Sequence, residues 1–368
     1  MLWPINSKTM AIKIMIKISI FCLFSYLIIG ASCKPDFNSD ISQLVNGYIV
    51  GDKFSGIIRV YKDNNIIFSK SAGFADFKAR RPLNDNTPFR IGSVSKTFTA
   101  ISILILYERN KLSLTDTIGR FITYLPKSYQ GVTLKQLLTH TSGIPDYLVR
   151  NPLVTDSLIN SDAIDSLISK DFLYFQPGTK FRYCNSGYMI LGLIVEKVTN
   201  MSFQEFVKQN IFQPLDMDDT YFLEPNNFKQ ADRALSHDNF GNIWEIPLFV
   251  KGDGGMVSTT DDLYKWYKGL TSNRIISDST FEKAIQSNIT TKGDTTNYGY
   301  GFETFPTKHG LNIAGHRGGL GGTGVYFVFE PSGDNFIITM TNNNCQKTGE
   351  IVERISMLLN DFDYNKND

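Results

Sequence analysis

Apolar residues gather in two pairs of short segments, one pair near each end of the chain, and a polar, turn-forming sequence separates the two members of each pair. Near the N-terminus, residues 56–61 and 66–70 flank the turn sequence Asp63-Asn64-Asn65. Near the C-terminus, residues 325–329 and 336–340 flank Pro331-Ser332-Gly333-Asp334. β-Branched and aromatic residues on either side of a turn-forming sequence are typical of antiparallel strand pairs. The pattern therefore predicts a β-hairpin at each end.

Helical patterns dominate the chain between these hairpins. Residues 95–107 are apolar on nearly every side, as in a buried helix. Further helices are predicted at 186–198, at 261–270 and, closing the chain, at 350–359. Strands at both ends with helices between them predict an α/β fold: an antiparallel β-sheet flanked by helices, with an inserted, mainly helical subdomain at about residues 110–290.

The first 33 residues predict a targeting segment. Lys8, Lys13 and Lys17 precede an apolar run of about a dozen residues, 18–29, which ends in small residues before Cys33. A basic region, a short apolar run and small residues are typical of a secretory signal peptide. Cys33 resembles the lipidation site of bacterial lipoproteins. A simply secreted protein and an uncleaved anchor are the alternatives, and all three place residues 34–368 outside the cytoplasm, in the cell envelope or beyond it.

Composition and charge exclude several classes of protein. The 368 residues are 42% hydrophobic and 20% charged, as in ordinary globular proteins, and the formal net charge is +1. Because nucleic-acid binding requires an excess of basic residues, no nucleic-acid partner is predicted. The four cysteines and four histidines are scattered, and neither a CxxC nor an HExxH motif occurs. We therefore predict no metal and no cofactor.

The first candidate for chemistry is Ser93-Val94-Ser95-Lys96, which opens the predicted buried helix. A serine hydroxyl is a weak nucleophile that needs a neighbouring base. Residues three apart on a helix share one face, so Lys96 lies within reach of Ser93. A lysine among apolar neighbours can lose its proton near neutral pH and act as that base. A chance Ser-x-x-Lys match is the alternative, since one or two are expected in a chain of this length.

The second candidate is Tyr183-Cys184-Asn185. A tyrosine beside a lysine can carry a proton to a leaving group, and an asparagine amide can donate to a substrate carbonyl while accepting from Lys96. The alternative interpretation is that Tyr183 and Asn185 only cap the next helix. Cys184 is interpreted as a small buried residue.

The third candidate is the glycine-rich segment 315–324, which contains His316-Arg317-Gly318-Gly319. Residues 319–324 also fit the dinucleotide-binding pattern GxGxxG. That pattern requires a strand before it and a helix after it, whereas a strand follows here. The segment is therefore predicted to be a strand edge that a substrate can approach closely, with backbone N–H groups free for an oxyanion hole.

Together, Ser93-x-x-Lys96, Tyr183-x-Asn185 and His316-Arg317-Gly318 resemble the serine β-lactamase-like family, which includes class C β-lactamases, DD-peptidases and related esterases and amidases. The resemblance spans roughly residues 40–360. It implies that Ser93 is acylated and that Lys96 and Tyr183 transfer protons. It further implies that Asn185, His316, Gly318 and Gly319 contact the substrate, and that the N–H groups of Ser93 and Gly319 form the oxyanion hole.

Two residues depart from the pattern of class C β-lactamases. His316 stands where lysine is usual, a variant found among DD-peptidase-like and esterase-like members, and Arg317 replaces threonine. Arg317 is placed among the substrate-binding residues with two alternatives: it binds a substrate carboxylate, or it points to solvent. Both departures weaken the case for an efficient β-lactamase. His140, in a Thr-His-Thr-Ser-Gly segment, is interpreted as structural.

The sequence thus predicts a secreted or lipid-anchored serine hydrolase. A Ser93 acyl-enzyme would cleave ester, amide or D-amino-acid peptide bonds in a small-molecule or peptide substrate. The alternative hypothesis is a penicillin-binding-like sensor or envelope-binding module that is acylated once and does not turn over. Membrane attachment would come from a lipid on Cys33.

Overall fold

The computed structural model describes residues 37–51, 54–148, 158–229, 232–306, 312–331, 335–343 and 347–364. The predicted signal peptide and Cys33 lie outside the described residues. Within the described part of the chain, no helix is both long enough and apolar enough to cross a membrane.

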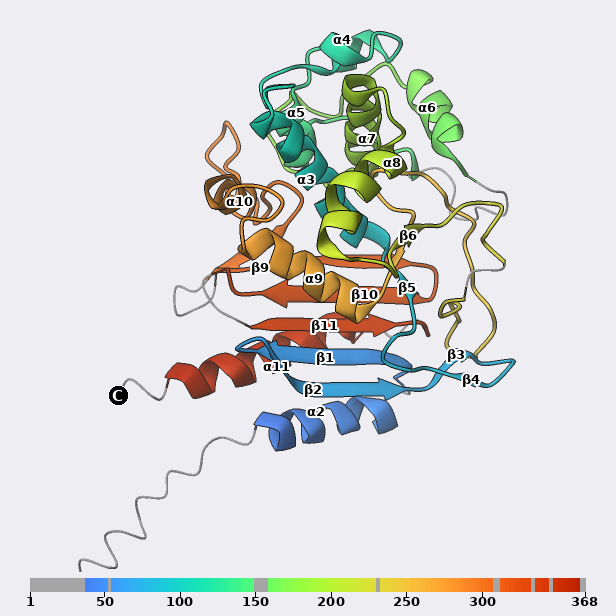
Figure 1. Ribbon diagram of the computed structural model, residues 1–368. Coiled ribbons are helices and arrows are strands. Elements are labelled where there is room, and N and C mark those ends of the chain that lie inside the picture. The colour runs from blue at the N-terminus through green and yellow to red at the C-terminus, as the bar shows by residue number, and fades with distance from the viewer. Residues whose placement is uncertain are drawn as a thin grey trace, which may run out of the picture.

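A six-stranded sheet with the order β2-β1-β11-β10-β9-β8 forms the centre of the molecule, and each neighbouring pair is antiparallel (Figure 1). Its N-terminal strands are β1 (Gly56–Lys62) and β2 (Asn65–Ala72). Its C-terminal strands are β8 (Glu303–Pro306), β9 (Asn312–Leu320), β10 (Thr323–Phe329) and β11 (Phe336–Thr341). The two ends of the chain meet where β1 pairs with β11, which confirms the predicted fold class.

The first hairpin turns where the sequence predicts it. Asp63 and Asn64 have φ angles of 51° and 63°. Two successive residues with positive φ are characteristic of the type I′ turn, whose twist matches that of paired strands. Asp and Asn tolerate this conformation better than most residues other than glycine.

Side chains alternate between the two faces of the sheet, and each face has its own hydrophobic layer. On one face, Ile58 and Val60 pack with residues of α2 (Phe37–Gly51) and α11 (Thr348–Tyr364). On the other face, Ile57 belongs to the large core beneath the helical region. The terminal helices therefore cover one side of the sheet and the helical region covers the other (Figure 1).

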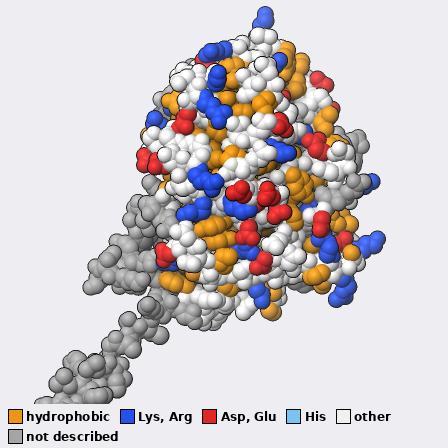
Figure 2. All heavy atoms as spheres, in the orientation of Figure 1, with side chains coloured by type: hydrophobic (Ala, Val, Ile, Leu, Met, Phe, Trp, Pro, Cys, Tyr) orange, Lys and Arg blue, Asp and Glu red, His pale blue; other side chains and the backbone are white. Residues whose placement is uncertain are grey.

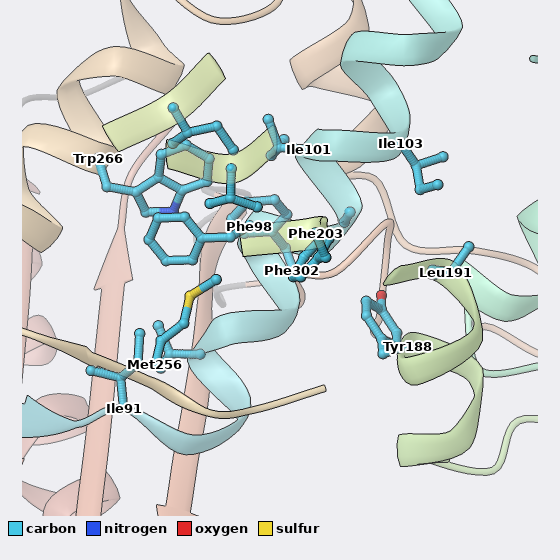
Figure 3. Close-up of a cluster of buried hydrophobic side chains, with 14 of the residues drawn as sticks. Ile91, Phe98, Ile101, Ile103, Tyr188, Leu191, Phe203, Met256, Trp266 and Phe302 are labelled. Atoms are coloured by element: carbon cyan, nitrogen blue, oxygen red, sulfur yellow. The ribbon is translucent and has the colours of Figure 1, made fainter. Parts of the chain in front are cut away.

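The helical region is organised around α3 (Ser95–Glu108), from which every residue between Ser95 and Leu106 is buried. Phe98 stacks on Trp266 with ring centroids 4.3 Å apart, and Figure 3 shows both rings in the core around α3. The other helices are α4 (Ile118–Phe121), α5 (Leu134–Leu138), α6 (Asn160–Ile168), α7 (Asn185–Thr199), α8 (Phe203–Val207), α9 (Thr260–Thr271) and α10 (Asp278–Ala284).

Two small sheets complete the fold. The first has the order β5-β7-β6, formed by β5 (Phe89–Arg90), β7 (Met256–Ser258) and β6 (Tyr221–Phe222). The second pairs β3 (Phe74–Asp76) with β4 (Arg81–Pro82). On the face seen in Figure 2, basic and acidic side chains are interspersed, in keeping with the net charge of +1.

Candidate active site

Ser93 lies in a tight turn between the small sheet and α3. β5 ends at Arg90, and the 3₁₀ turn η1 (Gly92–Val94) leads directly into the helix. Gly92 has a φ of +50°, and a Cβ atom there would lie 2.7 Å from the backbone nitrogen of Gly319. Only glycine fits this position, because a side chain would push the Ser93 turn away from β9.

The glycines of β9 provide the matching surface. A Cβ atom on Gly318 would lie 2.0 Å from the carbonyl oxygen of Ile91, so the strand and the Ser93 turn are in direct backbone contact. A Cβ atom on Gly319 would meet only the Thr323 oxygen, at 3.5 Å. Gly92 and Gly318 therefore bring the Ser93 turn and β9 into backbone contact, and the predicted oxyanion hole uses N–H groups from these two segments.

Lys96 is fully buried and has three hydrogen-bond partners. Its Nζ atom lies 2.9 Å from Ser93 Oγ, 2.8 Å from Asn185 Oδ1 and 2.8 Å from the carbonyl oxygen of Asp253. All three are neutral oxygens. If the ammonium loses one proton, the lone pair on Nζ can face Ser93 Oγ at proton-transfer distance.

Asn185 and Tyr183 enter the site from the start of α7. Asn185 is the first residue of that helix, and its amide oxygen binds Lys96. The Tyr183 ring centroid lies 5.0 Å from Lys96 Nζ, and 37% of the residue's surface is exposed. The ring therefore contacts both the buried lysine and the space open to a substrate. Ser93, Lys96, Tyr183 and Asn185, separated in sequence by up to 92 positions, lie together.

His316 reaches the site as a buried, neutral ring. Its Nδ1 atom donates to the carbonyl oxygen of Arg317 at 2.6 Å, so Nε2 accepts from the Tyr298 hydroxyl at 2.9 Å. Burial, the largest cause, and the charge of Lys96 together lower the pKa of His316 to about 3. Because both ring nitrogens bond to the protein, His316 does not offer a substrate the positive charge that a lysine would offer there.

Arg317 does not join the site, which corrects the prediction that it binds substrate. Its guanidinium lies 2.9 Å from Glu353 on α11 and 3.6 Å from Glu303. Neighbouring residues of a strand point to opposite faces, so with His316 directed toward Ser93, Arg317 must point to the α11 side. The alternative, in which Arg317 points to solvent, describes half of its side chain, which is 50% exposed and also pairs with these glutamates.

The structure adds two residues that sequence reasoning missed. Asp253 binds Lys96 through its main-chain oxygen, a contact that no side-chain pattern reveals. Burial raises the pKa of its carboxyl group to about 6, although the charge of Lys96 opposes this. Tyr298 donates to Nε2 of His316, and nothing in its spacing from His316 predicts this contact.

His140 lies against the site and has the structural role predicted for it. Its Nδ1 atom accepts the N–H of Cys184 at 3.1 Å, and its ring centroid is 4.3 Å from that of Tyr183. Burial and the charge of Lys96 hold the pKa of His140 well below its usual value. Among the residues that the structure describes, no group of three or more His, Cys, Asp or Glu side chains is placed to hold a metal ion.

The family model described as Beta-lactamase matches residues 42–357. The chain belongs to this family of serine hydrolases. Penicillin-binding protein 4* of Bacillus subtilis is 30% identical to it over 304 residues, which cover 76% of this chain and 66% of that relative. This chain thus spans just under two thirds of the length of that relative.

Solved structures agree with this family assignment. The octameric penicillin-binding protein homologue from Pyrococcus abyssi superposes with a TM-score of 0.77 and 29% identity, covering 87% of this chain and 77% of that one. D-amino acid amidase from Ochrobactrum anthropi superposes with a TM-score of 0.76 and 20% identity, covering 88% and 99%. At that identity the second likeness shows the fold alone.

Proposed function

We propose that this family member is a secreted or lipid-anchored hydrolase that cleaves ester, amide or D-amino-acid peptide bonds through an acyl-enzyme on Ser93. The observation that carries the proposal is the 2.9 Å contact between Ser93 Oγ and the buried Lys96 Nζ. A serine hydroxyl beside a lysine held by neutral oxygens is an activated nucleophile.

In the first half of the reaction, neutral Lys96 takes the proton of Ser93 as Oγ attacks the substrate carbonyl carbon. The N–H groups of Ser93 and Gly319 donate to the oxygen on which negative charge develops. Tyr183 gives a proton to the departing amine or alcohol and regains one from Lys96. The products of this half are the Ser93 ester and the free leaving group.

In the second half, water attacks the Ser93 ester. Tyr183 and Lys96 take the water proton and return it to Ser93 Oγ as the ester bond breaks. The carboxylic acid leaves and the site returns to its initial protonation state. No redox step and no cofactor enter this cycle.

The charges of the residues around the site indicate which class of substrate it favours. His316 is neutral with both nitrogens engaged, and Arg317 pairs with glutamates on the far face of the sheet. Neither residue offers a cation for a substrate carboxylate. The arrangement therefore favours uncharged esters and amides over penicillins, which carry a carboxylate. The penicillin-binding names of the relatives and the predicted signal peptide support an envelope location.

Intact mass after treatment with a fluorophosphonate tests the proposal. We expect one adduct on the wild type and none on Ser93→Ala. Hydrolysis of p-nitrophenyl butyrate should then continue beyond one equivalent. A burst of one equivalent followed by no turnover would instead support the sensor hypothesis. A folded wild type that gains no adduct would contradict acylation of Ser93.

A further inference from the structure

We infer that two adjacent residues, Asp146 and Tyr147, position Lys96 from opposite sides. Each one holds a group that binds the lysine: Asp146 holds Asn185, and Tyr147 holds Asp253. The inference rests on the proposed function, since it concerns how the base of that reaction is kept in place. The loop that follows α5 thereby becomes part of the catalytic machinery without touching the substrate.

Asp146 fixes the orientation of the Asn185 amide. Its Oδ2 atom accepts the backbone N–H of Asn185 at 2.7 Å and the side-chain Nδ2 at 3.1 Å. The amide oxygen then faces Lys96 Nζ at 2.8 Å. A rotated amide would turn its oxygen toward a carboxylate and its NH₂ group toward a lysine, so both contacts would become unfavourable.

Tyr147 acts on the second partner of Lys96. Its hydroxyl donates to Asp253 Oδ2 at 2.7 Å, while the main-chain oxygen of Asp253 accepts from Lys96. Asp253 lies between Gly252 and Gly254, and Gly252 has a φ of +98°. Glycines leave a backbone free to move, so the side-chain anchor helps to fix where the carbonyl points.

The loop segment that carries Asp146 and Tyr147 is itself held by Ser186. The backbone N–H of Tyr147 donates to Ser186 Oγ at 2.9 Å, and that hydroxyl donates to the carbonyl of Pro145 at 2.9 Å. The loop is thus fastened to the first turn of α7, the helix that begins with Asn185. Asp146 and Tyr147 are both buried. Such a support holds catalytic groups within the narrow range of positions that proton transfer requires.

The loss of either side chain should loosen Lys96. Without Asp146, the amide of Asn185 is free to turn. Without the Tyr147 hydroxyl, neither carboxyl oxygen of Asp253 keeps a side-chain partner, since Oδ1 already has none among the described residues. A displacement of about 1 Å costs up to about 100-fold in rate. Tyr147→Phe should leave substrate binding unchanged, because Tyr147 acts on Asp253, which is not among the proposed substrate contacts, whereas Asp146→Ala also frees Asn185, which is one of them.

Fluorophosphonate labelling of Ser93, measured against probe concentration, separates the maximal labelling rate from the apparent affinity. For Asp146→Ala we expect a maximal rate lower by about 10- to 100-fold, and for Tyr147→Phe a maximal rate lower by about 10-fold with the apparent affinity unchanged. In an Asn185→Ala background, Asp146→Ala should lower the rate less than about twofold, because its effect passes through Asn185.

Two matched variants serve as controls. Tyr48 is buried like Tyr147 and donates to Glu350 at 2.8 Å, but it lies on α2 across the sheet, so Tyr48→Phe should label at the wild-type rate. Asp116 accepts the N–H of Ser113 at 2.7 Å beyond the far end of α3, which at 1.5 Å per residue is about 20 Å from Ser93. Asp116→Ala should also label normally.

Equal labelling rates in test and control variants would overturn the inference, as would an undiminished effect of Asp146→Ala in the Asn185→Ala background. If Asp146→Ala does not fold, the isosteric Asp146→Asn takes its place. A wild type that does not label would refute the proposed function separately. Crystal structures of the variants give a further test. A displacement of the Asn185 amide and the Lys96 side chain relative to the wild type supports the inference, and unchanged positions refute it.

Discussion

Two buried cations in this molecule have opposite surroundings. Arg59, on β1, lies 3.2 Å from the carboxylate of Asp85 and pairs with Asp261, and the Tyr61 hydroxyl is a further neighbour. Lys96, on α3, binds a hydroxyl, an amide oxygen and a peptide carbonyl. Both side chains are almost completely shielded from water.

The groups that surround each cation determine its role. Two carboxylates hold Arg59 in its charged form, so it serves to connect β1 with α9. Lys96 Nζ binds three neutral oxygens, one of which is the hydroxyl of Ser93, so it lies where it can exchange a proton with the nucleophile. A buried cation paired with carboxylates is structural, whereas one surrounded by neutral acceptors can take part in chemistry.

The largest effect is expected from exchanging the two cation types. Lys96→Arg replaces the proposed base with a guanidinium, which does not lose its proton. We expect Ser93 labelling and ester hydrolysis to fall about 100- to 10,000-fold, the contribution of general-base catalysis. The reciprocal variant, Arg59→Lys, should hydrolyse the ester at the wild-type rate when that rate is divided by the amount of protein that labels at Ser93. Substantial activity in Lys96→Arg would show that the lysine is not the base.

Removing the paired cation should change stability instead of rate. Arg59→Met leaves two carboxylates facing a buried position without their counter-charge. We expect the free energy of unfolding to fall by about 2–3 kcal/mol, at or below the lower end for a broken buried pair, because Asp85 and Asp261 are half exposed. Urea unfolding measures this loss. A variant as stable as the wild type would show that Arg59 does not stabilise the fold, contrary to the structural role assigned to it in the comparison with Lys96.

The strands of the sheet and the spatial arrangement of the site residues differ in how far the sequence predicts them. Strands β1 and β2 follow from their β-branched and aromatic residues and from a turn whose residues favour positive φ. Ser93 and Lys96 are one helical turn apart, so their proximity is also local. Tyr183 and Asn185 join them only because α7 packs on α3, and it is the family resemblance that makes this foreseeable.

Other features of the site could not be foreseen in the same way. The contact between Lys96 and the Asp253 carbonyl depends on backbone geometry, and so does the anchoring of Asp253 by Tyr147. The placement of Arg317 did carry a signal: adjacent strand residues point to opposite faces, so His316 and Arg317 could not both face Ser93. The identity of the residues alone does not decide which of the two faces the site.

A smaller effect concerns His316, which burial keeps neutral. Its folded-state pKa of about 3 lies below the ordinary 6.5, so its stabilising contribution is complete above pH 6.5 and is lost as the pH falls toward 3. At pH 5.5 the loss is about 1.4 kcal/mol. His316→Gln should therefore lose less stability than the wild type between pH 8 and pH 5.5 in urea unfolding. Parallel pH profiles would show that His316 is not held neutral.

The smallest effect is expected at Arg317, a third cation with yet another environment. Its side chain is half exposed, 2.9 Å from Glu353, and solvent screens this pair. Arg317→Ala should change the free energy of unfolding by less than about 1 kcal/mol and leave ester hydrolysis unaltered. An increase in KM of tenfold or more for a substrate with a carboxylate, but not for a neutral ester, would return Arg317 to the substrate site. Without such an increase, Arg317 is a structural cation like Arg59, and Lys96 differs from both because its Nζ lies 2.9 Å from the nucleophile and binds neutral oxygens.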